Sequence, residues 1–460
     1  MSDWKEYKLH EIVEITSSKR IMRSEYQEDG IPFFRSKEII ELNSGNEITT
    51  ELFISKERFL EIKNKFGTPS YGDILLTSVG TLGVPYFVNY KEEFYFKDGN
   101  LTWFRKFNNI LRSKYLYYWF SSPVGRKALK EITIGSTQPA LTITGLKSLT
   151  IHLPTLEEQD YIIEILDHLS SKIQLNTQIN QTLEQIAQAL FKSWFVDFDP
   201  VRAKVQALSD GMSLEQAELA AMQAISGKTP EELTALSQTQ PDHYAELAET
   251  AKAFPCEMVE VDGVEVPKGW VVSTISECSL KIQNGGTPKR SNLEYWENGD
   301  ISWLSSGEVC NNKVLVQSKE YITDLGLKGS AAKLIPPYST LVAIYASPTA
   351  GKCAFSGFET STNQAVCAII PKEEYTFFNY YHLQLQEKYF ANQASGSAQQ
   401  NISKKIIEET PVLIPNKVIL KKFNLLAKPI MNKTIENLKE NNNLERKRDL
   451  LLPKLLNGEV

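Results

Sequence analysis

The sequence predicts an α+β protein made of two duplicated α+β domains and two long helices that pair as an antiparallel coiled coil. Three observations lead to this prediction. Apolar and small residues recur four and three apart over 156–195, which is the spacing of a helix that packs against another helix. Adding 261 to these numbers lands on a second stretch of the same kind within 417–460. Short β-like runs between turn residues precede both stretches, and corresponding runs share residues.

The helix expected over 156–195 has an apolar seam that is interrupted by two asparagines, Asn176 and Asn180. At 1.5 Å per residue this helix would be roughly 60 Å long, which is longer than a small domain is wide. Asn437 and Asn441 stand at the equivalent seam positions of the second stretch. A seam that is repeated together with its polar members indicates an internal duplication.

Helix midpoints predict the register of this helix pair. Asn176 lies in the middle of the first helix and Asn437 in the middle of the second, so antiparallel pairing predicts that these two face each other. Two prolines predict departures from a regular second helix, a kink at Pro429 and an end at Pro453.

Charge is distributed unevenly along the 460 residues. The net charge is −6, but 196–260 contains 12 acidic and 4 basic residues, a balance of −8, so the remainder carries +2. That remainder is able to present basic faces to nucleic acid. The five cysteines form no C-x-x-C pair, and no stretch approaches the ~20 apolar residues of a membrane span. With an N-terminus that does not resemble a signal peptide, these features predict a reduced, cytoplasmic protein.

Composition and the repeat together predict the domain boundaries. Residues 196–262 are rich in Ala, Gln and Glu, and helix starts at Ser213 and Thr229 with a stop at Gly227 predict a helical connector. In the first domain we expect strands over 31–36, 73–78, 84–90, 100–105 and 149–154, and helices over 113–120 and 124–132. The expected order is a first α+β domain, a central spacer helix, the acidic connector, a second α+β domain and a distal spacer helix, over 1–155, 156–195, 196–262, 263–416 and 417–460.

The two α+β domains match at offsets that drift between 270 and 261, as expected when loops differ in length around one scaffold. Asn100 matches Asn363. Longer matches join Ile31-x-Phe33-x-Arg35-Ser36-x-Glu38 to Ile301-x-Trp303-x-Ser305-Ser306-x-Glu308, and Gly135-Ser136-x-Gln138 to Gly396-Ser397-x-Gln399.

The sequence lacks recognisable motifs for catalysis or cofactor binding. It contains neither G-x-x-x-x-G-K-[ST] nor G-x-G, so a phosphate loop and a dinucleotide fingerprint are absent. Ile335-Pro-Pro-Tyr338 resembles a tetrapeptide of adenine methyltransferases, but Ile335 cannot accept from a target amino group and we interpret this segment as a turn. The five histidines have no metal-ligand spacing. We therefore expect no catalytic residue and no metal site.

The segment that closes the first long helix is Phe191-Lys-Ser-Trp-Phe-Val-Asp-Phe-Asp-Pro-Val-Arg202. Together with the duplicated module and the paired Gly-Ser-x-Gln segments, it resembles the specificity subunits (HsdS) of type I restriction-modification enzymes. The resemblance covers essentially the whole chain. It implies that each α+β domain is a target-recognition domain for one half of a split DNA sequence, and that the long helices set the spacing between the halves. It also implies a non-catalytic subunit.

The resemblance further implies partner proteins. The long helices would dock two methyltransferase subunits (HsdM), which nuclease and translocase subunits (HsdR) would join on double-stranded DNA. SAM, ATP and Mg²⁺ would then belong to these partners and not to this chain. The acidic connector departs from the pattern and leaves the family branch open. An alternative is a DNA-binding subunit of a modification-only or type II-like methyltransferase system.

Side chains that read bases must be polar, must lie on loops and must be near groups that bind phosphates. In the first domain the candidates are Lys19, Arg20, Arg23, Arg35, Ser36, Thr77, Ser78, Ser136 and Gln138. In the second domain they are Thr287, Lys289, Arg290, Ser305, Ser306, Tyr345, Ser347, Gln399, Gln400 and Asn401. Any of these could instead be an ordinary solvated residue. We expect Trp194, Phe195 and Phe198 to pack the helix end and not to stack on bases.

Two other classes of function compete with this interpretation. An enzyme with an unrecognised site, such as a nuclease, would cleave or methylate plasmid DNA when Mg²⁺ and SAM are supplied. A coiled-coil scaffold would not bind DNA, and a salt-dependent gel shift would exclude it.

Overall fold

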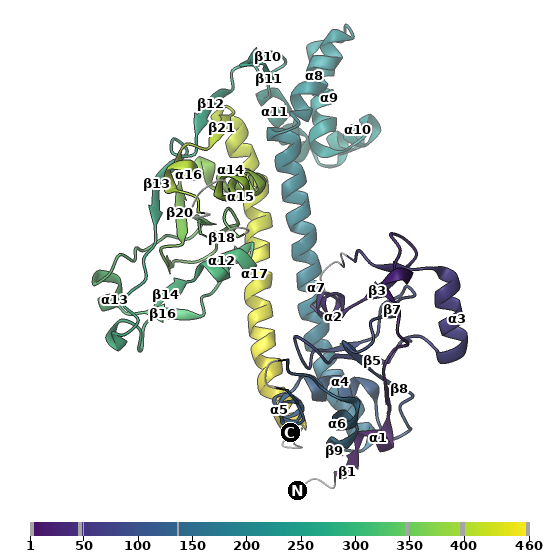
Figure 1. The fold of residues 1–460 in the computed structure, drawn as a ribbon. Coiled ribbons are helices and arrows are strands. Elements are labelled where there is room, and N and C mark those ends of the chain that lie inside the picture. The colour runs from purple at the N-terminus through teal and green to yellow at the C-terminus, as the bar shows by residue number, and fades with distance from the viewer. Residues whose placement is uncertain are drawn as a thin grey trace. The chain divides into compact units, whose positions relative to one another are not determined.

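In the computed structural model the chain folds into two compact units, which can be followed in Figure 1. Unit 1 is Met1–Gln178 with Glu440–Val460, and unit 2 is Ile179–Lys439. The structure describes residues 4–44, 48, 50–135, 138–345, 349–395 and 401–456.

Unit 1 contains the first α+β domain. Its strands are β1 (Lys5–Lys8), β2 (Glu14–Thr16), β3 (Ile31–Phe34), β4 (Phe53–Ile54), β5 (Ile74–Thr77), β6 (Pro85–Phe87), β7 (Tyr95–Phe96), β8 (Leu101–Arg105) and β9 (Thr150–Leu153). Its helices are α1 (Leu9–Ile12), η1 (Arg23–Glu25), α2 (Ser36–Asn43), α3 (Lys56–Phe66), α4 (Ser113–Ser121), α5 (Pro123–Glu131) and α6 (Ile143–Ser148). The central sheet has the antiparallel order β2-β8-β5-β6. A smaller sheet has the order β4-β3-β7, and β1 pairs with β9.

Unit 2 contains the second α+β domain. Its strands are β12 (Val271–Thr274), β13 (Ser279–Asn284), β14 (Ile301–Leu304), β15 (Val314–Leu315), β16 (Glu320–Ile322), β17 (Thr340–Ala343), β18 (Cys353–Ser356), β19 (Ser361–Thr362), β20 (Val366–Pro371) and β21 (Pro411–Ile414). Its helices are η2 (Leu293–Tyr295), α12 (Ser306–Asn311), α13 (Asp324–Lys328), η3 (Glu373–Tyr375), α14 (Thr376–Leu385), α15 (Glu387–Ser395) and α16 (Lys404–Glu408). The sheets have the orders β13-β20-β17-β18-β15, β16-β14-β19 and β12-β21.

The two domains share one topology. The sheet β2-β8-β5-β6 recurs as β13-β20-β17-β18, with β15 added at the edge of the second copy. The parallel pair β3–β7 of the smaller sheet recurs as the parallel pair β14–β19. The structure places a strand or helix within each of the ranges predicted for the first domain. The predicted fold class, two duplicated α+β domains with two long helices, is thereby confirmed.

The two long helices are α7 (Leu156–Phe195) and α17 (Lys417–Leu456). In unit 2 Asn180 is bonded to Asn437, while Phe191 packs on Phe423 with ring centroids 5.8 Å apart. Residue numbers therefore rise along one helix and fall along the other, so the pair is antiparallel there. The predicted end at Pro453 is wrong, because α17 continues to Leu456.

Each long helix contributes to the core of its unit. In unit 1 Ile162 and Leu166 of α7 and Leu452 of α17 pack with the central sheet and with α4. In unit 2 Trp194 and Phe195 pack in one apolar cluster with residues of α14 and α17. The side chain of Trp194 is fully buried, so the expected packing at the end of the first long helix is confirmed.

The connector is a lobe of four helices in unit 2, α8 (Asp199–Ser209), α9 (Leu214–Ser226), α10 (Pro230–Thr239) and α11 (Pro241–Ala253). Ser213 and Thr229 cap α9 and α10 with complete capping boxes, and Gly227 ends α9 with a left-handed φ of 67°. A hairpin of β10 (Met258–Val261) and β11 (Val264–Pro267) follows. None of the described helices is long and apolar enough to cross a bilayer.

Candidate nucleic-acid interface

The end of the central strand β5 brings several of the predicted residues of unit 1 together around Asn100. The carbonyl of Asn100 accepts hydrogen bonds from the backbone N–H of Ser78 at 2.8 Å and from the Ser36 hydroxyl at 3.5 Å. The backbone N–H of Leu141 donates to the Ser78 carbonyl at 3.0 Å, which ties the loop that carries Gln138 to the same place. Gln138 itself is exposed. We name this group the Asn100 corner.

Unit 2 also places a serine beside an asparagine, Ser306 beside Asn363, but here the asparagine side chain makes the bond and not its carbonyl. Its side-chain Nδ2 donates to the Ser306 hydroxyl at 3.4 Å, and its backbone N–H donates to the Leu304 carbonyl at 3.1 Å. The backbone N–H of Ile402 donates to the Ile344 carbonyl at 2.8 Å, which matches the Leu141–Ser78 bond of unit 1. This Asn363 corner also receives Thr287, whose hydroxyl donates to Gln364 Oε1 at 2.5 Å. Tyr345 and Asn401 adjoin the Ile344–Ile402 bond, and Tyr345 is exposed.

A buried glutamate orders the turn beside each corner. Glu38 is fully buried, and Arg35 Nη2 donates to its Oε1 at 2.6 Å. Burial raises the pKa of the Glu38 carboxyl, but the hydrogen bonds from the Arg35 side chain and backbone outweigh this, and the pKa falls below its usual value. In unit 2 the Ser305 hydroxyl donates to Glu308 at 2.8 Å instead. The scaffold is therefore kept while the side chain that it presents differs between the copies.

In both domains a Lys-Arg pair lies in the chain segment that connects the first strand of the central sheet to the first strand of the smaller sheet. In unit 1 the ammonium of Lys19 lies 4.4 Å from the centre of the Phe66 ring. Arg20 and Arg23 are exposed, and neither forms an ion pair within the described residues. Cations of this kind suit phosphate contacts, which position a protein on DNA without reading its sequence.

The matching pair in unit 2 is Lys289 and Arg290, and here the arginine is held in place. Arg290 donates to both carboxylate oxygens of Glu320, at 2.5 and 2.9 Å, and this pairing lowers the pKa of the Glu320 carboxyl. Its guanidinium also lies 3.7 Å from the centre of the Trp296 ring and 4.9 Å from that of Trp303. Arg290 is thus oriented before any ligand arrives, whereas Arg20 is not.

Thr77 and Ser78 do not belong among the candidates for base contact. Both side chains are buried, with exposed fractions of 0% and 3%. The Thr77 hydroxyl accepts from the backbone N–H of Val84 at 2.9 Å, and the Ser78 hydroxyl is bonded to Thr102 at 2.7 Å. The prediction failed because all four residues of β5 are buried, so alternation along the strand does not expose every second side chain.

Four of the predicted residues lie outside the described part of the chain, namely Ser136, Ser347, Gln399 and Gln400. Among those described, Asn100, Asn363, Gln364 and Trp296 are site residues that our sequence reasoning did not single out. Asn100 and Asn363 carried a usable signal, because both copies retain an asparagine there. Gln364 and Trp296 gave none, since only the fold brings them to Thr287 and Arg290.

The four seam asparagines pair across the two long helices, in a register that differs from the prediction. In unit 1 Asn176 Nδ2 donates to Asn441 Oδ1 at 2.9 Å. In unit 2 Asn437 Nδ2 donates to Asn180 Oδ1 at 2.9 Å. The predicted pairing of Asn176 with Asn437 is wrong by one helical turn. In the observed register every seam asparagine meets another, whereas the predicted register would set Asn180 opposite Lys433.

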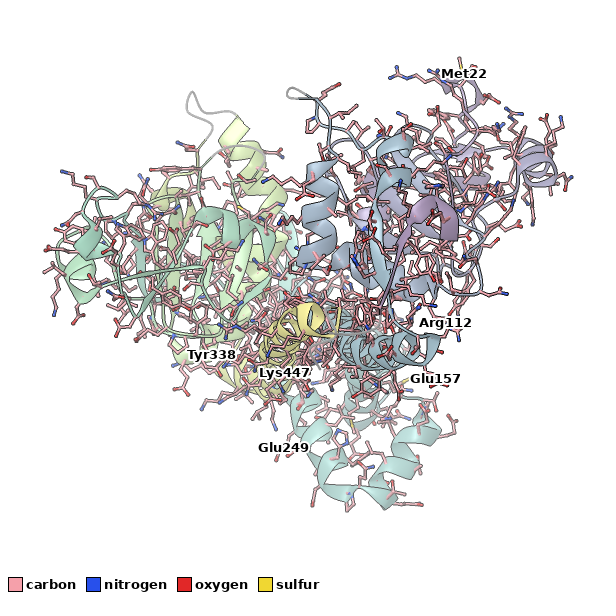
Figure 2. The ribbon with its side chains drawn as sticks, turned by 90° about the horizontal axis from the view of Figure 1, so that it is seen from below. Met22, Arg112, Glu157, Glu249, Tyr338 and Lys447 are labelled. Atoms are coloured by element: carbon pink, nitrogen blue, oxygen red, sulfur yellow. The ribbon has the colours of Figure 1, made fainter. Side chains whose placement is uncertain are left out.

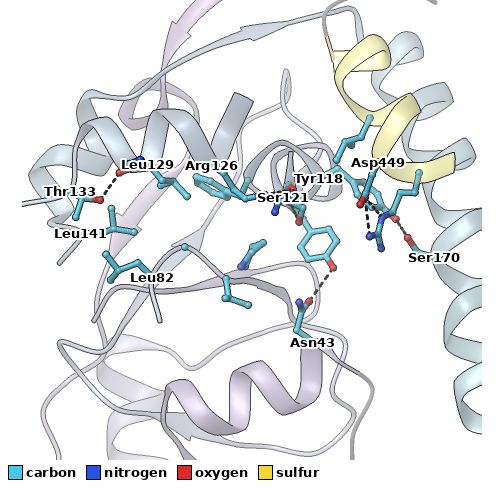
Figure 3. A pocket seen from close by; sticks show the side chains of 18 residues that line it. Asn43, Leu82, Tyr118, Ser121, Arg126, Leu129, Thr133, Leu141, Ser170 and Asp449 are labelled. Atoms are coloured by element: carbon cyan, nitrogen blue, oxygen red, sulfur yellow. Dashed lines mark hydrogen bonds and ion pairs between the residues drawn. The ribbon is translucent and has the colours of Figure 1, made fainter. Parts of the chain in front are cut away.

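A pocket of about 780 Å³ in unit 1 lies between α4, α5, the turn after β5 and the end of α17 (Figure 3). Its polar groups bond mainly to one another: the Tyr117 hydroxyl donates to Asn43 at 3.1 Å, and the Ser170 hydroxyl is hydrogen-bonded to the Tyr118 hydroxyl at 3.3 Å. These bonds fasten α4 to α2 and to α7, so the pocket is explained by packing. No group of three His, Cys, Asp or Glu residues that could hold a metal occurs in the described ranges.

A comparison with protein families gives the identity of this architecture. The model of the type I restriction modification DNA specificity domain matches residues 1–185 and again 267–446. The chain belongs to this DNA specificity family. The two matches cover the two α+β domains, each with a large part of the long helix that follows it, so family membership and the internal duplication agree.

Relatives within this specificity family extend over the whole chain. The type I restriction enzyme HindI specificity subunit of Haemophilus influenzae is 41% identical, and the match covers 100% of both chains. The MjaIX specificity subunit of Methanocaldococcus jannaschii is 28% identical over 100% of this chain and 94% of its own. The crystal structure of a type I restriction-modification S subunit from M. genitalium has the same fold, with a TM-score of 0.55, 14% identity and coverage of 99% and 96%. The predicted resemblance to type I specificity subunits is therefore confirmed.

Proposed function

We propose that this specificity subunit reads a bipartite, asymmetric DNA target, with each α+β domain contacting one half. The observation that carries the proposal is the pair of corners. Both domains bond a serine to an asparagine at matching positions, Ser36 to Asn100 and Ser306 to Asn363, and surround the pair with different side chains. Equal scaffolds would give the two domains the same way of meeting DNA, and unequal side chains would give them different base preferences.

The chemistry of the presented groups supports DNA as the ligand. In each domain the loop before the corner carries exposed arginine or lysine side chains, which are able to bind phosphates. Gln138, Ser306 and Thr287 offer both hydrogen-bond donors and acceptors to base edges. In the overall acidic chain these groups belong to the two α+β domains and not to the connector, where the excess of negative charge lies.

We further propose that the long helices dock two methyltransferase subunits, which nuclease and translocase subunits join. SAM, ATP and Mg²⁺ are assigned to these partners, and this chain is assigned no catalysis. The relatives named as specificity subunits of type I restriction enzymes support this division. The alternative, a modification-only or type II-like methyltransferase system, uses the same chain without the nuclease.

Methylation mapping tests the proposal. The full chain is co-purified with its methyltransferase partner, given SAM and a library of randomised DNA, and the modified sites are sequenced. We expect two short specified blocks separated by an unspecified spacer of fixed length. A single continuous block, or methylation without sequence preference, would contradict the proposal. Cleavage or methylation by this chain without partners would favour an enzyme instead.

A further inference from the structure

Tyr338 has a backbone conformation that the first domain gives to a glycine. In unit 1 the turn before β5 contains Gly72, which has a φ of 91° and donates its backbone N–H to the carbonyl of Val88 at 3.0 Å. In unit 2 the turn before β17 contains Tyr338, which has a φ of 64° and donates its backbone N–H to the carbonyl of Ser356 at 2.7 Å. Because β5 and β6 match β17 and β18, Gly72 and Tyr338 stand at the same position of the repeat. Residues with a side chain seldom adopt this left-handed conformation.

The side chain of Tyr338 joins its domain to α17. Its hydroxyl donates to Oδ1 of Asn432 at 3.1 Å, while its ring centre lies 5.7 Å from that of Phe355 and 6.5 Å from that of Phe377. Figure 2 shows Tyr338 next to α17, which is drawn in yellow. A phenylalanine would pack against the two rings equally well, so packing does not explain the hydroxyl. The strained backbone at the same residue is a further indication that its side chain has a function.

Unit 1 shows how a domain of this kind is held on a long helix. Arg112 donates from Nε and Nη2 to the carboxylate of Asp160, both at 2.8 Å, and Lys114 pairs with Asp167 at 2.6 Å. The two aspartates are seven residues apart on α7, which corresponds to about 10 Å along the axis. One directional contact would leave the domain free to pivot on the helix, whereas two separated contacts fix its angle.

Unit 2 also has two polar attachments, here on α17. At the first, Asn424 Nδ2 donates to the backbone carbonyl of Glu374 at 3.0 Å, and Lys417 pairs with the Glu374 carboxylate at 3.4 Å. The second is the bond between Tyr338 and Asn432, which lies eight residues beyond Asn424, or about 12 Å along the axis. The first attachment alone would let the domain pivot, so the Tyr338 hydroxyl supplies the second point that fixes its angle.

The other contacts of this domain with the long helices constrain its angle less. Lys313 and Gln384 reach Glu184 of α7, but at 3.4 and 3.3 Å, and both meet the same carboxylate oxygen. Phe378 and Tyr381 pack with residues of both long helices in one apolar cluster. Apolar burial is non-directional, so it holds the domain on the helices without selecting one angle.

We propose that Tyr338 is a positioning residue, whose bond to Asn432 sets the angle of the second α+β domain on α17 and thereby the spacer length that the subunit accepts. The inference rests on the proposed function, because a spacer exists only where two domains read separate half-sites. Without the bond, the domain also occupies neighbouring angles. A shift of its Asn363 corner by ~3.4 Å, one base step, is enough to read a spacer that is one base pair longer or shorter.

The test compares spacer lengths in the DNA sites that the full chain and its methyltransferase partner modify in a randomised library. Tyr338→Phe keeps the ring and removes the hydroxyl. We expect sites with a spacer one base pair longer or shorter to become roughly two- to tenfold more frequent, which is the effect of one lost hydrogen bond on a population. Base preferences within both half-sites should stay unchanged. Asn432→Ala should have the same effect, and the double variant should accept no wider range than either single variant, because all three lack the same bond.

Tyr71→Phe is the matched control. Tyr71 lies next to Gly72 in the corresponding turn of unit 1, and its side chain is 80% exposed, so loss of its hydroxyl should leave the spacer lengths of the wild type. Tyr338→Gly gives the turn of unit 2 the glycine of unit 1 and removes the ring as well as the hydroxyl. It should widen the range of spacers at least as much as Tyr338→Phe does, although it relieves the backbone strain.

Two results would overturn the inference. One is a single, unchanged spacer length in both the Tyr338→Phe and the Tyr338→Gly variants, since a lower melting temperature alone would make Tyr338 a packing residue. The other is equal widening by Tyr71→Phe. The proposed function fails in a different way, with a wild-type complex that modifies a continuous target without a spacer. A strict spacer in the wild type and in both Tyr338 variants would refute this inference alone.

Discussion

Asn176 Nδ2 donates a hydrogen bond of 2.9 Å to Oδ1 of Asn441 across the two long helices, where both side chains are nearly excluded from water. Asn441 in turn donates at 3.4 Å to the carbonyl of Ile173 and to the hydroxyl of Thr177. Buried amides in an otherwise apolar seam select one register, because any other register leaves their polar groups without partners.

This pair predicts opposite effects for single and double replacements. Asn176→Leu alone leaves Asn441 with an unsatisfied buried acceptor and should destabilise the protein by about 1–3 kcal/mol. Asn176→Leu with Asn441→Leu should melt at or above the wild-type temperature, because an apolar seam replaces a buried polar one. Thermal unfolding of the wild type, the two single leucine variants and the double variant measures the coupling free energy between the two side chains. Additive losses in the double variant would show that the two amides do not act as a pair.

Loss of the unique register should also affect DNA recognition. The same double leucine variant is combined with the methyltransferase partner, and the DNA sites that the complex methylates are sequenced. We expect it to accept more than one spacer length between the half-sites. An unchanged single spacer would show that the rest of the seam fixes the register without the asparagines.

Gln138→Ala tests whether the domains read independently. The change removes an exposed side chain that could pair with a base, an interaction worth ~1–3 kcal/mol of discrimination. We expect relaxed preference at one or two positions of one half-site and an unchanged second half. Gln399→Ala should affect the opposite half in the same way. Sequencing of modified sites from a randomised bipartite library distinguishes the outcomes, and equal loss in both halves would contradict independent readout.

Arg20 and Arg290 occupy matching positions but should respond differently to replacement. Arg20→Ala removes an exposed charge and is expected to weaken DNA binding on every sequence and to reduce the salt slope by about 1. Arg290→Ala also removes the contacts with Glu320 and Trp296, and should lower the melting temperature of unit 2. The expected loss is on the order of 1 kcal/mol, because the ion pair is half-exposed and screened by water. Equal melting temperatures for the two variants would contradict this assignment.

Acid should weaken the Arg35–Glu38 contact. The folded-state pKa of Glu38 is lowered below its usual 4.5, so its stabilising effect is present above about pH 4.5 and is lost as the pH falls through the folded value. Glu38→Gln should therefore lower the melting temperature at pH 7, and the difference from wild type should shrink below pH 4.5. Glu28→Gln, at an exposed position of the same domain, is the control and should have little effect at either pH. A constant difference across this range would rule out the ionised carboxylate as the cause.

Sequence by itself determined the features that rest on short-range chemistry or on the repeat. The capping boxes at Ser213 and Thr229 and the stop at Gly227 were predictable, because each involves residues within one helical turn. The duplication was predictable as well, since Asn176 and Asn180 recur at one offset as Asn437 and Asn441. The retained pair Asn100 and Asn363 was visible in the same way, although its role was not.

Only the tertiary structure decided which groups meet across long distances in the chain. The burial of Thr77 in the central sheet, the contact of Arg290 with Trp296 and the pairing of Asn176 with Asn441 each depend on how separate elements pack. The periodicity of one helix determines its seam but not its register against a partner, because several registers bury the same apolar residues. The register is decided by whether buried polar groups find partners, and that depends on both helices at once.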